Sequence, residues 1–567
     1  MRVALAQVNP TVGDIDGNAA IVAHRYADAV AAGADVVVFP ELVLTGYPPE
    51  DLLLRREFLE RAKSAAEKLV RETITAAATA LIGAPTMTGE TVFNSAIIAS
   101  RGKIHAVYHK MCLPNYGVFD EKRYFAHGAK ALLLDIDGTL AGVNICEDSW
   151  EPDGPHRPLC ISGARLILNL SASPYHRGKA GERRKAMASV CCNGRAFFCY
   201  TNLVGGQDEL VFDGGSFVLN DDGDVIASLP QFVEDMLIAD LPLAANGKRR
   251  KTSRKGAAAA CIVLRTLPDE KPAIPPPAVA PVLSDEDEVL KALVCGTRDY
   301  LHKNSFSKAL VGVSGGIDSA LTAAIAAEAL GQKNLTGLVM PGPFSSRETQ
   351  SDAETLCRNL GIEHHVIPIN AAFDVLIRSI QPALGRRPAG ITEENLQSRL
   401  RGLILMTFSN ATGAMVLVTG NKSEAATGYC TLYGDTAGGF AVIKDVPKTL
   451  VWKIARRINE QAHRELIPET IIKRVPSAEL RPDQKDSDSL PEYGVLDRIL
   501  KAYIEDGASI AGMAAAGLPE IEVRRTLDLV DGSEYKRRLY PPGVKITPRA
   551  FGRDWRRPLT NKYRSSR

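Results

Sequence analysis

The sequence predicts an α/β protein built from two domains. Its 567 residues exceed what one hydrophobic core usually organises. A proline-rich run over residues 268–284 has neither helical nor strand periodicity, which favours an extended spacer. On both sides of this run, short β-rich segments alternate with helical segments. We therefore place one domain over residues 1–265, a linker over 266–284 and a second domain over 285–567.

Composition narrows the class of protein. The chain is 45% hydrophobic and 24% charged with a formal net charge of +2, so nothing favours a nucleic-acid or acidic-membrane partner. A basic run at 248–255 is more typical of a solvated loop than of a polyanion site. Apolar runs such as 34–39 are far shorter than the roughly 20 residues that cross a bilayer. The N-terminus has no signal-peptide pattern and the ten cysteines include no CxxC pair, so we expect a cytoplasmic protein with free thiols.

Periodicity predicts the elements of the first domain. Helices are predicted where apolar residues recur at three-to-four-residue spacing, over 17–32 and 55–72. Strands are predicted over 36–39, 95–98, 142–145 and 166–169. This alternation indicates a layered α/β domain.

The second domain shows a βαβ rhythm. Strands are predicted over 309–313, 335–340 and 415–419, and a helix is predicted over 320–330. Because parallel strands need crossover connections, this rhythm predicts a doubly wound parallel sheet. Two segments, 385–395 and 481–491, are expected to be loops.

Three side chains, each at the end of a strand-like run in the first domain, suit amide chemistry. Glu41 in FPEL, Lys110 in YHK and Cys146 in NICED supply a carboxylate, an ammonium group and a thiol. Cleaving an amide through a thioester needs a base for the thiol proton, a nucleophile, and a cation or amide donor beside the oxyanion. Taken singly, Cys146 is more typical of a buried inert thiol, and Lys110 of a surface charge.

In this order the three motifs resemble the Glu-Lys-Cys triad of the nitrilase superfamily, and the resemblance spans most of the first domain. It implies an α-β-β-α sandwich. It also implies that Glu41 is the general base, Lys110 the stabiliser of the tetrahedral intermediate and Cys146 the nucleophile. Glu121, in FDEKRYF, matches the additional carboxylate with which many members position substrate. The triad alone does not choose a substrate.

Two further segments of the first domain narrow the substrate. LPNYGVFDE and SASPYHRGK resemble the glutaminase domain of the glutamine-dependent NAD synthetases. The resemblance implies that Tyr116, Ser173 and Lys179 contact glutamine. Without it, Tyr116 is more typical of a core aromatic and Ser173 of a turn or cap residue.

The most specific signal in the chain is VGVSGGIDS in the second domain. A strand leads into a Ser-Gly-Gly turn and a helix begins at or near Asp318, so backbone N–H groups and the helix N-terminus form a phosphate-sized anion site. The run lacks the GxxxxGK[ST] pattern of a Walker A loop and resembles the SGGxDS loop of the N-type ATP pyrophosphatases. That resemblance implies a Rossmann-like sheet of the adenine nucleotide alpha hydrolase type. The ATP-binding residues that it implies are Gly312, Val313, Ser314, Gly315, Gly316, Ile317, Asp318 and Ser319.

Several ligases share SGGxDS, so this loop does not name the acceptor. VTGNKSE and TLYGDTAGGF resemble the corresponding segments of NAD synthetases. The match implies deamido-NAD as the acceptor, Thr419 as a further ATP contact, and Asn395, Glu424 and Lys536 as contacts of deamido-NAD. Taken alone, Lys536 is more typical of a solvated charge. Short ammonia-using members carry an acidic residue near the position of Gly439, so their contacts there do not transfer to this chain.

Adenylation of a carboxylate also implies a magnesium ion, because the phosphate charge must be neutralised in the transition state. Asp318 and Glu424 are hard oxygen ligands suited to Mg²⁺.

Together the resemblances imply a ligase that hydrolyses glutamine in the first domain and uses the ammonia, with ATP, to convert deamido-NAD into NAD. AMP, diphosphate and glutamate would be the other products. Because free ammonia is mostly protonated near neutral pH, we expect an enclosed ammonia tunnel. The resemblance also implies a homo-oligomer, either a dimer or an octamer, that acts on small molecules.

Two alternatives stay open. One is another glutamine amidotransferase with the same ATP chemistry and a different acceptor, which TGNKSE and YGDTAGGF disfavour. The other is a binding or regulatory protein with a decayed nitrilase domain, which the presence of all three triad residues disfavours.

Overall fold

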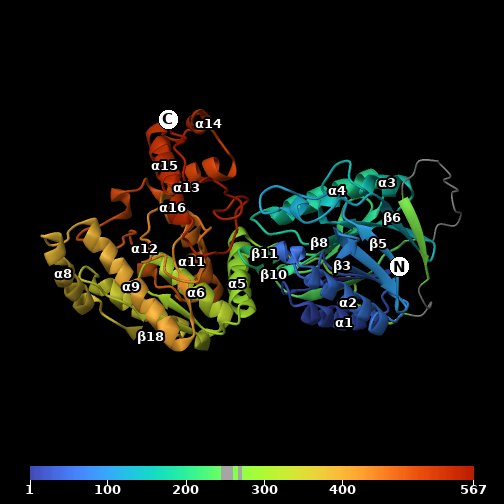
Figure 1. Ribbon diagram of the computed structural model, residues 1–567, viewed down its shortest axis with the longest axis horizontal. Helices are drawn as coiled ribbons and strands as arrows, with labels where there is room; N and C mark the ends of the chain where they lie inside the picture. Colours follow the sequence, from blue (N-terminus) through green and yellow to red (C-terminus); the bar gives the residue numbers. More distant parts are fainter. Residues whose placement is uncertain (244–258, 266–270, 567) are drawn as a thin grey trace. The chain divides into compact units, whose positions relative to one another are not determined.

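The computed structural model describes residues 1–243, 259–265 and 271–566, which form two compact units (Figure 1). The first unit holds Met1–Gln207 and Val211–Leu283, and the second holds Asp208–Leu210 and Ser284–Arg567. The basic run at 248–255 lies outside the described residues.

The first unit contains fifteen described strands and four α-helices. The strands are β1 (Arg2–Gln7), β2 (Val36–Val38), β3 (Thr79–Thr88), β4 (Thr91–Ser100), β5 (Lys103–His109), β6 (Ala131–Ile136), β7 (Thr139–Ile145), β8 (Leu166–Ser171), β9 (Phe197–Asn202), β10 (Val204–Gln207), β11 (Leu210–Asp213), β12 (Phe217–Leu219), β13 (Val225–Ser228), β14 (Asp235–Asp240) and β15 (Ala259–Leu264). The helices are α1 (Ile15–Ala31), α2 (Arg56–Glu72), α3 (His156–Ile161) and α4 (Lys179–Gly194).

These elements form four layers. Within the described residues, a six-stranded sheet has the order β14-β1-β2-β3-β4-β5, and a seven-stranded sheet has the order β13-β12-β9-β8-β7-β6-β15. Helices α1 and α2 pack on the six-stranded sheet, and α3 and α4 pack on the seven-stranded sheet (Figure 1). A shared apolar core fills the space between the sheets. The predicted α-β-β-α sandwich is confirmed.

Strand β8 shows why short apolar runs become strands here. Leu166, Leu168 and Leu170 belong to the core between the sheets, while Ile167 belongs to the core beneath α3 and α4. A strand that is buried on both faces has a nearly continuous apolar sequence.

Strand direction brings several strand ends to the same edges. In the six-stranded sheet β2 runs parallel to β3, and β5 is antiparallel to β4, which is itself antiparallel to β3. Strands β2 and β5 therefore end at one edge. In the seven-stranded sheet, β7 and β8 are parallel and also end together.

The described part of the predicted linker, 271–284, runs along the first unit. Arg2 Nη1 donates to the Pro272 carbonyl (2.7 Å), and Ser228 N donates to the Ala278 carbonyl (2.9 Å). Proline lacks a donor and has a fixed φ, so this segment stays extended and offers mainly carbonyl groups.

The second unit contains a parallel sheet and twelve described α-helices. The strands are β16 (Ala309–Gly312), β17 (Leu335–Val339), β18 (Glu363–Val366), β19 (Met415–Val418) and β20 (Phe440–Ala441). The helices are α5 (Asp285–Lys303), α6 (Ile317–Leu330), α7 (Arg347–Leu360), α8 (Asn370–Leu384), α9 (Ile391–Thr412), α10 (Lys422–Thr427), α11 (Lys448–Ala462), α12 (Glu469–Lys473), α13 (Tyr493–Leu500), α14 (Ile510–Ala515), α15 (Glu520–Gly532) and α16 (Glu534–Arg537).

The five strands have the order β18-β17-β16-β19-β20, and every neighbouring pair is parallel. The predicted parallel sheet is confirmed. Successive connections reverse direction between β16 and β19, so a crevice is expected at the carboxyl ends of these two strands. Helix α9 packs through Leu405 on the face that carries Leu310 and Val416, and α6 contacts β16 and β17.

The loop predicted over 385–395 is partly wrong, because α9 already begins at Ile391. Leu400 of α9 is buried against Phe373 and Ile377 of α8. This packing between two helices stabilises the first turns of α9, and a local sequence pattern does not report it.

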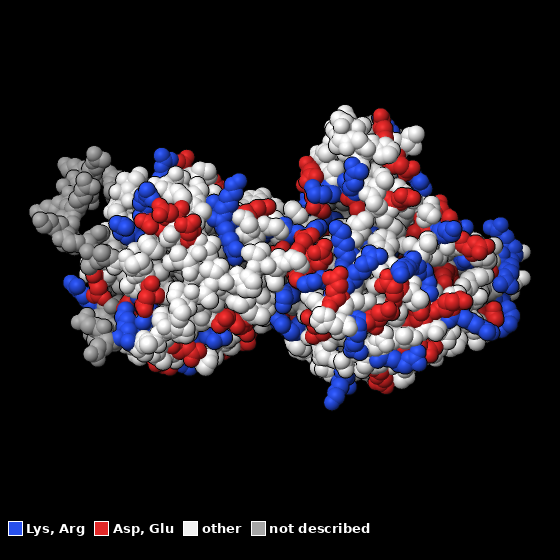
Figure 2. Space-filling model, turned by 180° about the vertical axis from the view of Figure 1, so that it is seen from behind, with Lys and Arg blue, Asp and Glu red and all other residues white. Residues whose placement is uncertain are grey.

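Helix hydropathy, the cysteines and the surface charges bear on the expectations drawn from composition. Among the described helices, none combines the length and the hydropathy that a membrane span requires. All ten cysteines lie in the described residues and none forms a disulfide. Basic and acidic side chains intermingle on the face drawn in Figure 2.

Candidate active sites

The three predicted triad residues meet between the two sheets of the first unit. Glu41 follows β2, Lys110 follows β5, and Cys146 follows β7. Lys110 Nζ lies 2.7 Å from Glu41 Oε1, and the charges of both groups act on the Cys146 thiol. All three side chains are buried. Strand ends that are far apart in sequence thus form one buried cluster.

Lys110 bridges two carboxylates. Its Nζ donates to Glu41 Oε1 (2.7 Å) and to Glu121 Oε1 (2.9 Å), and the Tyr47 hydroxyl donates to the same oxygen of Glu121 (2.9 Å). Glu121, the predicted additional carboxylate of the site, therefore contacts the lysine directly. Glu121 Oε2 is buried and has no hydrogen-bond partner among the residues that the structure describes.

Burial and charge shift the pKa values of this cluster in different directions. Burial raises the pKa of the Cys146 thiol well above its usual value, and the nearby Glu41 raises it further. Burial by itself would lower the pKa of Lys110. The negative charges of Glu121 and Glu41 outweigh this effect, so the pKa of Lys110 is raised. Burial raises the pKa of Glu121 to about 7, against the opposing charge of Lys110. These shifts favour a protonated Cys146 thiol beside the Lys110 ammonium group.

The Glu41 carboxylate is held by both sheets. Asn94 Nδ2, from β4, donates to Oε1 (2.7 Å), and the Ala172 backbone N–H, directly after β8, donates to Oε2 (3.0 Å). These bonds fix the orientation of a carboxylate that is otherwise fully enclosed.

A single buried carboxylate connects the turns that carry Lys110 and Cys146. Cys146 has a φ of 41° and opens a short 3₁₀ turn that ends at Ser149. Asp148, in this turn, accepts hydrogen bonds from Tyr108 Oη (2.7 Å), Ile145 N (2.9 Å), Met111 N (3.0 Å) and Cys112 N (2.8 Å). Asp148 thus stabilises both turns at once. This role of Asp148 was not predicted, although the residue stands two positions after the thiol in NICED.

Two of the predicted glutamine contacts, Tyr116 and Lys179, touch the short turn that begins at Cys146. Tyr116 donates its hydroxyl to Glu147 Oε1 (2.9 Å), and Lys179 Nζ lies 4.2 Å from the centre of the Trp150 ring. Burial raises the pKa of Tyr116 and lowers the pKa of Lys179. Glu147 and Trp150, which the sequence analysis did not single out, therefore set the positions of two predicted residues.

Ser173 is held by a buried ion pair that the sequence analysis also missed. Its backbone N–H donates to Asn202 Oδ1 (2.9 Å), and Arg183 Nη2 lies 3.4 Å from its Oγ. Arg183 forms a two-point ion pair with Asp213, at 2.9 and 3.1 Å. Such a pair is rigid because both guanidinium nitrogens have fixed directions.

The second unit contains a cavity of about 290 Å³ at the carboxyl ends of β16 and β19, where the strand order predicts a crevice. Its walls include 312–318, the predicted contact Thr419 and the carboxylate residue Glu424. Ser319 lies behind this wall, where its Oγ accepts from Ser314 N (3.2 Å) and donates to the Gly316 carbonyl (3.0 Å). Ser319 therefore supports the turn from behind.

Gly315 is required by the shape of this turn. Its φ is 81°, and a Cβ atom there would lie 2.2 Å from the Thr349 carbonyl oxygen. Only glycine combines this conformation with so close an approach of the first turn of α7.

Asp318 and Glu424 share one lysine. Lys448 Nζ donates to Asp318 Oδ2 and lies 3.8 Å from Glu424 Oε1, while Asn421 Nδ2 donates to Asp318 Oδ1 (2.9 Å). Burial raises the pKa of Glu424 to about 8, and the charge of Asp318 raises it further. The two predicted metal ligands are thus adjacent to one another. The role of Lys448, which stands in IKDVPKT, was not predicted.

Two predicted acceptor contacts lie outside the cavity wall and bind the segment that follows α10. Lys536 Nζ donates to the carbonyls of Gly428 (2.7 Å) and Cys430 (2.8 Å). Asn395 Oδ1 accepts from Thr431 Oγ1 (2.9 Å). Lys536 is therefore an anchored lysine and not a solvated charge.

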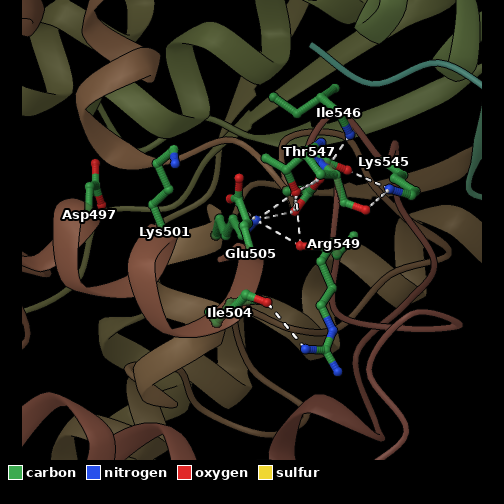
Figure 3. A network of polar contacts seen from close by, with 12 residues as sticks. Asp497, Lys501, Ile504, Glu505, Lys545, Ile546, Thr547 and Arg549 are labelled. Carbon is green, nitrogen blue, oxygen red and sulfur yellow. Dashed lines mark hydrogen bonds and ion pairs between the residues drawn. The ribbon is translucent and has the colours of Figure 1, made fainter. Parts of the chain in front are cut away.

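A buried ammonium group also anchors α10, the helix that carries Glu424. Lys422 Nζ donates to Glu505 Oε1 (2.9 Å), Thr547 Oγ1 (2.6 Å) and the Arg549 carbonyl (3.1 Å). These acceptors come from two segments, the turn that ends at Glu505 and the stretch 545–549, which lie side by side in Figure 3. The network connects the C-terminal part of the chain to the TGNKSE turn.

Two families of known proteins match separate parts of the chain. Residues 2–251 match the family described as carbon-nitrogen hydrolase, and residues 289–540 match the family described as NAD synthase. The chain is 46% identical over 574 residues to the glutamine-dependent NAD(+) synthetase of Thermotoga maritima, covering 100% of this chain and 99% of that protein. It is 42% identical over 570 residues to the enzyme of the same name from Aquifex aeolicus, covering 99% of this chain and 100% of that protein.

A solved structure extends this likeness to three dimensions. The glutamine-dependent NAD+ synthetase from Acinetobacter baumannii, in complex with adenosine diphosphate, has a TM-score of 0.76 and 38% sequence identity. The match covers 98% of this chain and 98% of that chain. Fold and sites define a carbon-nitrogen hydrolase unit joined to an NAD synthase unit. The chain belongs to the family of glutamine-dependent NAD(+) synthetases.

The position of Asp148 generates a prediction about stability. In Asp148→Asn an amide NH₂ group replaces one acceptor and faces backbone donors, so the free energy of unfolding should fall by about 1–3 kcal/mol. Chemical denaturation measures this change. Asp153→Asn, at an exposed position on the same loop, should change it by less than about 0.5 kcal/mol. Equal stability of the two variants would contradict the assigned role.

Proposed function

We propose that this protein is a ligase that makes NAD from deamido-NAD, with glutamine as the nitrogen donor and ATP as the energy source. The observation that carries the proposal is the pairing, on one chain, of a buried carboxylate–lysine–thiol cluster with a cavity walled by an SGGIDS turn. The names of the relatives support this choice of substrates.

In the first unit, Glu41 takes the proton of Cys146 as the sulfur attacks the amide carbon of glutamine. A base is needed because burial keeps this thiol protonated at neutral pH. The Lys110 ammonium group and the backbone N–H after Cys146 stabilise the oxyanion. Ammonia leaves with the proton from Glu41, and water then hydrolyses the thioester to glutamate.

Glutamine would be held by Tyr116, Ser173 and Lys179. Lys179 suits the α-carboxylate, because burial lowers its pKa and an anionic partner offsets that cost. Glu147 orients Tyr116, and Arg183 orients Ser173.

In the second unit, a carboxylate oxygen of deamido-NAD attacks the α-phosphorus of ATP and diphosphate leaves. Ammonia then attacks the acyl carbon of the adenylate, and AMP leaves. The turn 312–319, with Thr419, would bind the phosphates through backbone N–H groups and the N-terminus of α6. The acceptor would contact Glu424. It would also depend on Asn395 and Lys536, which hold the segment after α10.

The carboxylates of Asp318 and Glu424 suit Mg²⁺. They are hard oxygen donors that stand together at the cavity, and their charge is only partly balanced by Lys448. When bound, the ion would supply charge neutralisation at the phosphates. We propose a cytoplasmic homo-oligomer, a dimer or an octamer, on the family resemblance alone.

The proposed division of labour predicts a split phenotype for Cys146→Ala. Glutamine-driven synthesis of NAD should fall by at least about 1,000-fold, because the nucleophile is lost, while ammonia-driven synthesis persists. Mass detection of NAD, AMP and glutamate, with ATP, magnesium and deamido-NAD present, measures both. Cys192→Ala, at an exposed thiol, is the matched control. Equal loss of both activities would contradict two sites, and ADP with phosphate as products would contradict the ATP chemistry.

The shared lysine predicts the pH dependence of glutamine hydrolysis. Glu121 and Glu41 both face Lys110, and the pKa of Glu121 is raised to about 7, so the cluster binds a proton as the pH falls through that value. Protonation of Glu121 removes one of the two negative charges that contact the Lys110 ammonium group, so kcat/KM should fall about tenfold per pH unit below 7. In Glu121→Gln one carboxylate is gone, which should move this limb to lower pH. If the acidic limb of the kcat/KM profile does not move in Glu121→Gln, the explanation is wrong.

We also propose that ammonia passes between the sites without equilibrating with the medium. Free ammonium is a poor nucleophile, and two complementary half-reactions on one chain favour direct transfer. When unlabelled glutamine and [15N]ammonium are both supplied, NAD should carry mainly unlabelled nitrogen. Mass spectrometry reads the label, and free exchange of the label into NAD would defeat the proposal.

A further inference from the structure

Arg401 is an unusual lining residue of the cavity in the second unit. It lies on α9, and its Nε donates to the Met340 carbonyl (3.0 Å) directly after β17. Within the described part of the chain, neither of its Nη atoms has a hydrogen-bond partner. A largely buried guanidinium group therefore keeps most of its donors available for a ligand.

The surroundings of Arg401 favour an anionic ligand. Burial lowers its pKa to about 10, and the one charge that opposes this shift is that of Glu479. The other two cations of the cavity wall are already paired, Lys448 with Asp318 and Arg474 with Asp352. Because an uncompensated buried charge is costly, an anion bound beside Arg401 would recover part of that cost.

Glu479 occupies a place that suits a phosphate oxygen. Its Oε2 accepts from Thr349 Oγ1 (2.9 Å) and from Ser346 N (3.4 Å), both in the first turn of the 14-residue helix α7. Its backbone has a φ of 47°, an uncommon conformation for a residue with a side chain. A helix N-terminus with a hydroxyl donor binds carboxylate and phosphate oxygens alike.

This first turn of α7 also borders the glycine turn. A Cβ atom on Gly315 would lie 2.2 Å from the Thr349 carbonyl, and both residues line the cavity together with Glu479 and Arg401. Donors from α7, donors from the glycine turn and the Arg401 guanidinium thus surround one space.

We propose that Arg401 and the first turn of α7 form a phosphate-binding subsite of this cavity, in which the Glu479 carboxylate stands in for a phosphate oxygen and is displaced when nucleotide binds. The inference rests on the proposed nucleotide site and adds to it. Arg401 contacts the phosphate, and Glu479 competes with it for the same donors.

Two charge-removing variants should act in opposite directions. Arg401→Gln should weaken the binding of ADP with Mg²⁺ by about tenfold or more, because a charge-assisted hydrogen bond is lost. Glu479→Gln should strengthen it about threefold, because the competing charge is gone. Isothermal titration calorimetry on the full chain measures both affinities. Unchanged ADP affinity in Arg401→Gln, or weaker binding in Glu479→Gln, overturns the inference.

Controls separate this subsite from folding and from the proposed reaction. Glu348→Gln, at an exposed position in the first turn of α7, should leave ADP affinity unchanged, and Arg401→Lys should retain part of it. If Arg401→Gln does not fold, Glu479→Gln still decides the question. Failure of the inference leaves the wild type binding ADP and making AMP, whereas a wild type that does neither overturns the proposed function.

Titrations with AMP and with inorganic diphosphate locate the phosphate. A loss for diphosphate and ADP but not for AMP assigns the subsite to the diphosphate that is released. A loss for AMP and ADP but not for diphosphate assigns it to the α-phosphate. Either result supports the subsite, and no loss with any of the three ligands refutes it.

Discussion

Both sites depend on one constraint, which is that strands running in the same direction end at the same edge of a sheet. Glu41 and Lys110 follow β2 and β5, whose common direction places them 2.7 Å apart although 69 residues separate them. The glycine turn and the TGNKSE turn follow β16 and β19, between which the sheet reverses its order of connection. Polar groups can gather in these places because strand ends, unlike strand interiors, leave backbone donors unpaired.

The two sites also share one arrangement of charged groups. In each, a buried lysine lies between two carboxylates: Lys110 between Glu41 and Glu121, and Lys448 between Asp318 and Glu424. One lysine cannot neutralise two carboxylates that are taken out of water, so one acid in each site has a raised pKa. This unbalanced charge makes each group responsive to a proton, a substrate or a cation.

Much of the fold and part of each site could be predicted from the sequence. Strand β8 was visible as LILNLS, and the SGGIDS turn was visible because its glycines and its following helix are local features. Asp148 and Arg401 were not predicted, because their roles lie in bonds to backbone groups that no spacing rule connects to them. The start of α9 was misplaced for a similar reason, since it depends on packing against α8.

The sequence by itself determined the α/β class, several of the strands and helices, and the chemical groups at the strand ends. These features follow from periodicity over a few residues and from side-chain chemistry. Only the tertiary structure decided which carboxylates share a lysine, which cation keeps free donors, and which residue supports a turn from behind. Such partnerships join distant segments inside a low-dielectric interior, where burial and distance set the energy of each charge.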